Sequence, residues 1–207
     1  GNAVLARFFS WHGVRRGHRV ADVGNSLVFR SPTGEWDYER VSHHDRRNNV
    51  LHLSLLGFDP QRRALLTQEL LRFRPDFIRA GSPTLLAFLS LYLLDHPEIH
   101  IRPRVVFVGG ERLLPDQRAV IGEAFACPVV DVYGNWEYVV FGGECAQGRL
   151  HLATEMGIVE ILRDGRPCPP GEPGDITITS LWNRAFPFVR YQIGDVAFLE
   201  GQPCACG

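Results

Sequence analysis

The order of helical and strand-like segments between residues 59 and 132 is the feature that most restricts the fold. Asp59-Pro60 and Ser82-Pro83 each predict the start of a helix, because Asp and Ser cap the first turn and proline suits the first helical position. The pattern predicts helices over 60–74, 83–94 and 115–125 and strands over 77–80, 105–108 and 128–132. Strands alternating with helices at this spacing form right-handed crossovers, so we expect an α/β fold with a parallel βαβ core.

The regions before residue 59 and after residue 137 lack this alternation of strands and helices. After residue 137, short strands at 150–153, 158–162, 175–180 and 196–199 alternate with Gly/Pro turns, which predicts a smaller β-rich subregion. Before residue 59 we expect the end of a helix near residues 4–9, short strands at 19–23 and 26–30, and irregular structure over 31–50. The predicted organisation is therefore 1–58 as a partial N-terminal subregion, 59–137 as the βαβ core and 138–207 as the β-rich subregion.

Charge and composition narrow the class of protein. The 22 basic residues, all arginine, nearly balance 23 acidic ones, so a nucleic-acid partner is not expected. The dense apolar stretch Leu85–Leu94 is too short to cross a bilayer. An odd number of cysteines without a secretion signal favours a reducing, cytoplasmic setting. Because the chain begins with Gly rather than Met and ends in Cys204-Ala205-Cys206-Gly207, we interpret it as a piece of a longer protein.

Three loops that follow strands carry residues able to bind a ligand. They are Gly109-Gly110-Glu111, Tyr133-Gly134-Asn135-Trp136-Glu137 and Arg190-Tyr191-Gln192-Ile193-Gly194-Asp195. Ligands of open α/β sheets bind at the carboxyl ends of strands, glycine lets a flat ligand approach the backbone, and a carboxylate after glycine suits a vicinal diol. Each loop alone also fits an ordinary turn, so only their order and combination indicate a site.

Four residues have the composition of a metal site. Cys145, His151, Cys204 and Cys206 supply three thiolates and one imidazole, the number of ligands in a closed structural Zn²⁺ site. The alternative is that these cysteines are buried apolar side chains, because the two pairs are far apart in sequence and lack the spacing of a standard zinc finger.

Taken together, these motifs resemble one enzyme family. The series Gly-Gly-Glu, Tyr-Gly-x-x-Glu, Glu-Cys…Leu-His, Pro-Gly-Glu-x-Gly-Asp-Ile, Asn-Arg-Ala-x-Pro-x-x-Arg-Tyr-x-x-Gly-Asp and Cys-x-Cys-Gly covers about residues 60–207. It resembles the phenylacetate–CoA ligase branch of the adenylate-forming enzymes, in particular the capsular-polysaccharide CapK-like members. The resemblance implies an internal segment of that family's large N-terminal domain, and the family's Cys-x-Cys-Gly turn adds weight to the zinc interpretation.

The resemblance also implies a reaction and a set of roles. A small aryl or alkyl carboxylic acid attacks ATP with Mg²⁺ present, giving an acyl-adenylate, and a thiol of CoA or a carrier then takes the acyl group. By the same resemblance Gly109, Gly110, Glu111 and Gly134 line the nucleotide site and Tyr133 stacks on adenine. Glu137 corresponds to the Mg²⁺-associated catalytic glutamate, and Asp195 to the acceptor of both ribose hydroxyls.

The sequence departs from the family pattern in three respects. Trp136 stands where many adenylate-forming enzymes have Thr, and neither the Ser/Thr/Gly-rich phosphate loop nor any lysine is present. We therefore expect the isolated chain to be inactive. Two alternatives stay open: a non-catalytic nucleotide-binding or scaffold relative, and a zinc-stabilised binding module that uses no nucleotide.

Overall fold

A computed structural model describes residues 2–24, 29–30, 33–55, 57 and 59–206. The chain divides into two compact units. We call His12–Asp131 the sheet unit, and Gly1–Trp11 with Val132–Gly207 the β-rich unit. The boundaries expected after residues 58 and 137 do not coincide with this division, and as domain boundaries they stay a prediction.

The sheet unit is built on parallel strands. Its strands follow the order β8 (Val129–Gly134), β7 (Val105–Gly109), β6 (Phe77–Ala80), β1 (Val20–Gly24), β5 (Val50–Ser54) and β4 (Ser42–Asp45). β1 pairs in parallel with both β5 and β6, and β6 pairs in parallel with β7, whereas β4 pairs antiparallel with β5. The short strands β2 (Phe29–Arg30) and β3 (Trp36–Asp37) form a separate antiparallel pair. The predicted α/β class with a parallel core is confirmed.

The three crossover helices begin where the sequence predicts. They are α2 (Pro60–Phe73), α3 (Pro83–Leu94) and α4 (Pro115–Phe125). Asp59 accepts a hydrogen bond from the Arg62 amide at 2.9 Å, and Ser82 accepts one from the Leu85 amide at 3.3 Å. These caps satisfy backbone donors that the first helical turn leaves without a partner, which is why the Asp-Pro and Ser-Pro pairs mark the helix starts.

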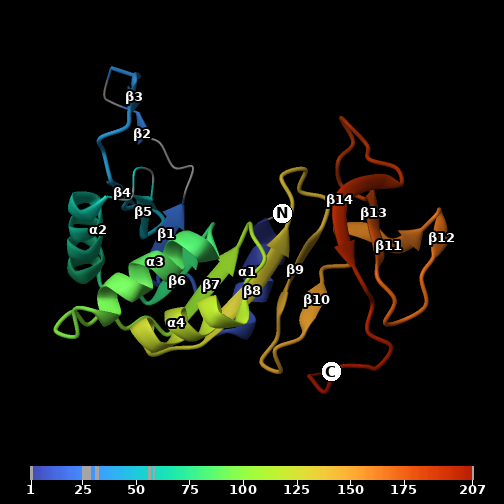
Figure 1. The fold of residues 1–207 in the computed structure, drawn as a ribbon. Helices are drawn as coiled ribbons and strands as arrows, with labels where there is room; N and C mark the ends of the chain where they lie inside the picture. Colours follow the sequence, from blue (N-terminus) through green and yellow to red (C-terminus); the bar gives the residue numbers. More distant parts are fainter. Residues whose placement is uncertain (1, 25–28, 31–32, 56, 58, 207) are drawn as a thin grey trace. The chain divides into compact units, whose positions relative to one another are not determined.

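The core of the sheet unit lies between one face of the sheet and these helices (Figure 1). Strand residues that alternate along β1 and β6, such as Ala21, Val23, Ile78 and Ala80, are buried against helix residues such as Leu89. Since successive strand side chains point to opposite faces, one apolar face suffices to seat all three helices.

The region before residue 59 contributes more to this sheet than the sequence predicts. β5 and β4 lie within or next to a stretch that we expected to be irregular, yet β5 is an inner strand. The sequence Val50-Leu51-His52-Leu53-Ser54 does not clearly predict a strand, because His52 interrupts the apolar run. The expected strand over 26–30 is described only at its end, since residues 26–28 lie outside the described residues.

The β-rich unit contains one helix and short antiparallel strands. They are α1 (Asn2–Trp11), β9 (Phe141–Glu144), β10 (Leu150–Leu152), β11 (Gly157–Arg163), β12 (Arg166–Pro167), β13 (Gly174–Ser180) and β14 (Tyr191–Ala197). β12, β11, β13 and β14 form one sheet in that order, and β9 pairs with both β10 and the end of β8. The strand expected at 196–199 is therefore wrong in its bounds, because the residues that pair with β13 begin at Tyr191.

Strand β9 was not predicted, because Gly142-Gly143 is typical of a turn. Its glycines serve packing instead: a Cβ on Gly143 would lie 2.0 Å from the Phe8 ring, and one on Gly142 would lie 2.8 Å from a Leu150 methyl. Phe8 is 3% exposed and meets the Phe141 ring edge-on at 5.4 Å. The glycines thus allow helix α1 to pack directly against the strand backbone.

Within the described part of the chain, no helix has the length and apolar character needed to cross a bilayer.

Helix α3 supplies a matched pair for testing the core. We expect Leu89→Ala, at a fully buried position, to lower the free energy of unfolding by about 3 kcal/mol. Leu91→Ala, on the same helix at 47% exposure, should cost less than about 1 kcal/mol. Urea denaturation of both variants measures the difference; equal losses would contradict the helix orientation described above.

Candidate nucleotide site and metal centre

In the sheet unit, the predicted ligand loop lies at the carboxyl end of β7. Gly110 has a φ of +80°, and a Cβ there would lie 2.5 Å from the carbonyl oxygen of Gly81, at the end of the neighbouring β6. Gly109, Gly110 and Glu111 are therefore the terminus of a parallel strand, where ligands of such sheets bind. The close approach of two backbones explains why glycine is needed at position 110.

The carboxylate of Glu111 accepts hydrogen bonds from two hydroxyl groups of the protein. Its Oε1 accepts a hydrogen bond from the Ser82 hydroxyl at 2.9 Å, and its Oε2 accepts one from the Thr84 hydroxyl at 2.7 Å. The sequence interpretation missed both partners, because Ser82 and Thr84 come 27 or more positions before Glu111. The pairing of Ala80 with Val108 in adjacent strands brings the two loops together.

In the β-rich unit, Tyr133 and Asp195 are in direct contact. The Tyr133 hydroxyl donates to Asp195 Oδ2 at 2.6 Å, although the two residues are 62 positions apart. Burial, followed by the hydrogen bond to Asp195 and the negative charge of that carboxylate, raises the pKa of Tyr133 well above its usual range. The phenol therefore stays protonated and acts as a donor at any physiological pH.

Asp195 lies in β14 where the pairing of this strand with β13 shifts register. Gly194 precedes it with a φ of +87°, a conformation that side-chain-bearing residues rarely adopt. Asp195 is exposed, and an ionised carboxylate accepts about four hydrogen bonds. Tyr133 uses one of these positions, so about three stay available.

Glu137 lies in the turn after β8. The Asn135 side-chain oxygen accepts from the Val139 amide at 3.2 Å, and this closes the turn that contains Trp136 and Glu137. The Tyr191 hydroxyl donates to Glu137 Oε1 at 3.4 Å, a long contact that leaves the carboxylate half-buried with most of its acceptor capacity unused. Trp136 is 86% exposed. A Cβ on Gly134 would lie at ordinary contact distances from its neighbours, so packing does not require glycine at this position.

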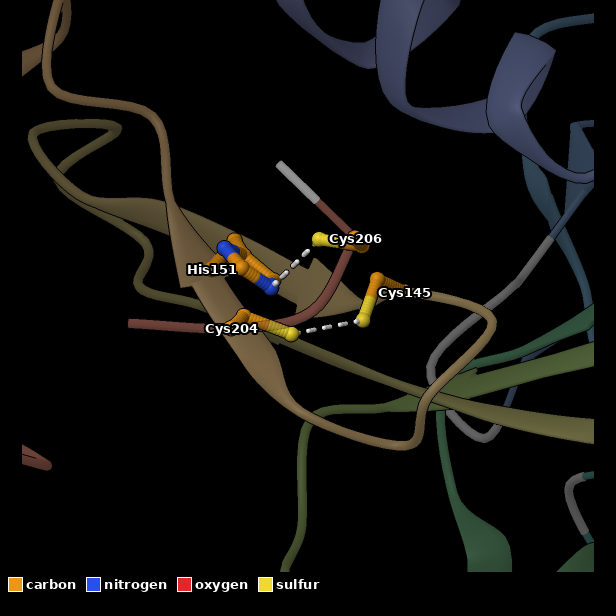
Figure 2. Close-up of side chains that lie close together, drawn as sticks. All are labelled: Cys145, His151, Cys204 and Cys206. Carbon is orange, nitrogen blue, oxygen red and sulfur yellow. Dashed lines mark hydrogen bonds between the residues drawn. The ribbon is translucent and has the colours of Figure 1, made fainter. Parts of the chain in front are cut away.

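The structure brings the four predicted metal ligands together. One ligand atom from each of Cys145, His151, Cys204 and Cys206 lies within 4.8 Å of every other, and the side chains point toward one another in Figure 2. Cys145 Sγ lies 3.7 Å from Cys204 Sγ, and Cys206 Sγ lies 3.4 Å from His151 Nε2. Three sulfurs and one imidazole nitrogen around a common point match the donor set of a closed tetrahedral zinc site.

Local structure explains how these ligands meet. The Cys145 amide and carbonyl close the turn between β9 and β10, bonding to Arg149 O and the Gly148 amide, both at 2.9 Å. Arg149 then binds the C-terminal segment, with an ion pair to Glu200 at 3.0 Å and a hydrogen bond to Gln202 O at 3.2 Å. The C-terminal cysteines are thereby held against the β9–β10 hairpin, an anchoring role for Arg149 that its sequence context does not reveal.

The thiols of this cluster differ in acidity. Burial opposes ionisation of Cys145, but hydrogen bonds from the Arg149 and Gln147 amides, together with His151 and Cys204, outweigh it and lower its pKa to about 6. The contact with Cys204, then desolvation and the Cys145 charge, raise the pKa of Cys206 to about 11. One thiolate is thus favoured near neutral pH, and a divalent cation would be needed to stabilise more negative charge in so small a volume.

Several known proteins resemble this chain in sequence or in fold. No family model matches the chain. A phenylacetate–coenzyme A ligase of Thermus thermophilus is 27% identical over 156 residues, which cover 71% of this chain and 34% of that enzyme. The solved 2-hydroxyisobutyryl-CoA ligase, in an open conformation with 2-HIB-AMP and CoA, matches 99% of this chain and 45% of its own at a TM-score of 0.73 and 20% identity. The acyl-CoA synthetase of Brucella canis matches 92% of this chain and 38% of its own at 0.58 and 17% identity.

The chain is similar in sequence to a phenylacetate–coenzyme A ligase and in fold to solved acyl-CoA ligases. The resemblance predicted from the motifs is thereby confirmed, and the solved structures confirm that the fold is that of adenylate-forming ligase domains. The match spans about a third of the length of that curated enzyme. The roles of individual site residues stay predictions.

Elemental analysis tests the metal centre directly. We expect protein purified without added metal to carry about one zinc per chain, as a closed four-ligand site does. Cys206→Ser should lose the metal, because it removes one thiolate at an exposed position. Cys168→Ser is the control, since that thiol lies outside the cluster and donates to Pro173 O. Less than about 0.2 zinc per chain in the unaltered protein would contradict a zinc site.

Proposed function

We propose that this chain carries the nucleotide-binding part of an ATP-dependent acid–thiol ligase. The substrate is a small aryl or alkyl carboxylic acid, and the acceptor is CoA or a carrier thiol. The observation that carries the proposal is the 2.6 Å hydrogen bond between Tyr133 and Asp195. It joins the two residues that the family resemblance assigns to the adenine base and the ribose, although they come from motifs far apart in sequence.

The proposed reaction has two steps. A carboxylate oxygen of the acid attacks the α-phosphorus of ATP, and the bond to pyrophosphate breaks to give a mixed anhydride, the acyl-adenylate. A thiol sulfur then attacks the acyl carbon, and AMP leaves. The first step depends on orienting the reactants and neutralising developing charge, so residues that hold the nucleotide in place contribute directly to the rate.

Asp195 and Tyr133 would hold the nucleoside. The two ribose hydroxyls are donors, and the carboxylate of Asp195 retains acceptor positions for both. Tyr133 stays a neutral donor because its pKa is raised, and its bond to Asp195 orients the carboxylate before the ribose arrives. This preorganisation lowers the entropy that binding would otherwise cost.

The Glu137 carboxylate is suited to bind Mg²⁺. Mg²⁺ in nucleotide sites is commonly held by one or two protein carboxylates together with substrate phosphates, so a single half-buried carboxylate is an adequate protein contribution. When bound, the cation would neutralise charge on the phosphates. Tyr191, through its contact with Glu137, would keep that carboxylate turned toward the same loop.

A zinc ion in the Cys145/His151/Cys204/Cys206 cluster would serve structure in this proposal. All four positions are filled by protein side chains, which leaves no open coordination site for a reacting group. Its effect would be to fix the segment that follows β14, the strand that carries Asp195.

Nucleotide affinity tests the proposed roles. We expect Asp195→Ala to weaken AMP binding by roughly 1–3 kcal/mol, because the ribose hydroxyls lose a charged acceptor. Asp175→Ala removes an exposed carboxylate from the neighbouring strand β13 and should leave AMP binding unchanged. Titration of both variants with AMP measures the difference. Equal affinity in the unaltered chain and in Asp195→Ala would refute the assignment of the ribose site.

The isolated chain should bind nucleotide without activating an acid. The sequence contains no lysine, so the ammonium that the family places near the attacking acid has no counterpart here. Arg190 is no substitute, because its guanidinium pairs with Glu160 at 3.2 Å and is not equivalent to a mobile ammonium. ATP–pyrophosphate exchange across a panel of aryl and alkyl acids measures this. Acid-dependent exchange above background would contradict the mechanism proposed above.

A further inference from the structure

A pocket of about 650 Å³ lies in the β-rich unit, against the sheet that contains β11, β13 and β14 (Figure 1). Two buried residues, Leu162 on β11 and Thr177 on β13, belong to its wall at 4% and 2% exposure. The segment between β13 and β14, together with the start of β14, supplies much of the remaining wall, including Phe186, Phe188, Arg190, Tyr191 and Gln192. All of these residues belong to one compact unit of the chain.

Aromatic rings form the apolar part of this wall. The Phe188 ring lies 5.3 Å from the Phe186 ring at an angle of 69°, and 4.9 Å from the Tyr191 ring at 50°. Phe186 is 68% exposed, so its ring has surface to offer a partner. Aromatic rings attract one another in offset and edge-on arrangements, which favours a ligand with a planar ring.

The polar part of the wall includes a row of side chains across three strands. Thr177 lies opposite Glu160 of β11 and opposite Gln192 of β14. Residues directly opposite in antiparallel strands share a face of the sheet, so the three side chains form one row. The Thr177 hydroxyl, in the middle, makes no hydrogen bond within the described part of the chain. Burial of an unpaired hydroxyl costs free energy, and a ligand group that pairs with it would remove that cost.

The charged groups beside Thr177 are paired with each other. Arg190 Nε and one terminal nitrogen of its guanidinium donate to the two carboxylate oxygens of Glu160, each at 3.2 Å. Because β13 lies between β11 and β14, this ion pair crosses the strand that carries Thr177. A carboxylate entering the pocket would meet the charge of Glu160, and Arg190 already neutralises that charge. The pocket therefore favours a neutral ligand over an anion.

We propose that this pocket binds a small neutral molecule in which a planar aromatic ring carries a carboxamide. The ring packs against Phe186 and Phe188, and the carboxamide pairs with the Thr177 hydroxyl and the Gln192 side chain. A hydroxyl and an amide side chain each donate and accept, so together they complement a carbonyl oxygen beside an N–H. Since Thr177 is 2% exposed, a group that reaches its hydroxyl displaces part of the mostly exposed segment 181–190.

This site is separate from the proposed nucleotide site. Tyr133, Glu137 and Asp195 are not among the residues that line it. A neutral carboxamide is neither the acid nor the nucleotide of the proposed reaction, so the inference does not rest on that function. Tyr191 connects the two sites, because its ring lines the pocket while its hydroxyl donates to Glu137 at 3.4 Å.

A titration of this 207-residue chain with benzamide, followed in glycine-selective ¹⁵N spectra, provides the measurement. Gly165 lines the pocket, whereas Gly148 lies in the turn between β9 and β10. We expect benzamide to shift the Gly165 signal with a dissociation constant of about 1 mM, and to leave the Gly148 signal in place. Benzoate has a carboxylate where benzamide has a carboxamide, and it should bind about tenfold more weakly.

Three variants test the polar contacts. Thr177→Val keeps the shape of the side chain but removes the hydroxyl, and it should weaken benzamide binding about fivefold, as the loss of a neutral hydrogen bond does. Gln192→Ala, at an exposed position that leaves the core intact, should have a similar effect. Thr154→Val, at an exposed threonine outside the pocket, is the control and should bind benzamide as the unaltered chain does.

Three results would overturn the proposal. The first is a Gly165 signal that benzamide does not shift in a saturable way. The second is benzoate binding as tight as benzamide binding, because it would show that the pocket accepts an anion. The third is an unchanged benzamide affinity in either Thr177→Val or Gln192→Ala.

Discussion

Parallel pairing of strands is the constraint on which the sheet unit depends. Parallel neighbours cannot be joined by tight turns, and the connections from β5 to β6, β6 to β7 and β7 to β8 cross back over the sheet through α2, α3 and α4, which pack on the same apolar face. The connection between the parallel neighbours β1 and β5 instead carries β2, β3 and β4. The same geometry places the carboxyl ends of β6 and β7 next to each other. The loops that begin at Gly81 and Gly109 therefore meet at one edge, which is where a ligand of such a sheet binds.

The β-rich unit is held together differently. One buried cluster in this unit is centred on Val139, Val140, Ile161, Ile176 and Ile178, and Phe8 and Phe141 are buried as well. Polar contacts add to this apolar packing. Tyr133 with Asp195, Arg190 with Glu160, and the cysteine–histidine cluster each join segments distant in sequence. A structural zinc would add an apparent binding energy on the order of 10 kcal/mol to such a unit.

The site residues divide by what they touch. Asp195 and Glu137 each accept one hydrogen bond from a tyrosine hydroxyl, whereas Glu111 accepts two, from Ser82 and Thr84. An ionised carboxylate accepts about four hydrogen bonds, so Glu111 uses about half of its acceptor positions within the protein. Consecutive residues of one motif therefore differ in their contacts: Gly110 lies against the Gly81 carbonyl, and Glu111 binds the start of α3.

The sequence by itself determined the α/β class, the three crossover helices with the caps of the first two, the resemblance to the phenylacetate–coenzyme A ligases and the four residues of the cysteine–histidine cluster. These depend on local signals: Asp-Pro and Ser-Pro pairs, apolar periodicity, and the types of side chain that metals prefer. Only the tertiary structure decided that β5 is an inner strand, that Gly142 and Gly143 belong to a strand packed against Phe8, and that Glu111 binds Ser82 and Thr84. Each of these depends on which strands become neighbours, and strand order is set by the burial of a whole sheet face rather than by any short segment of the chain.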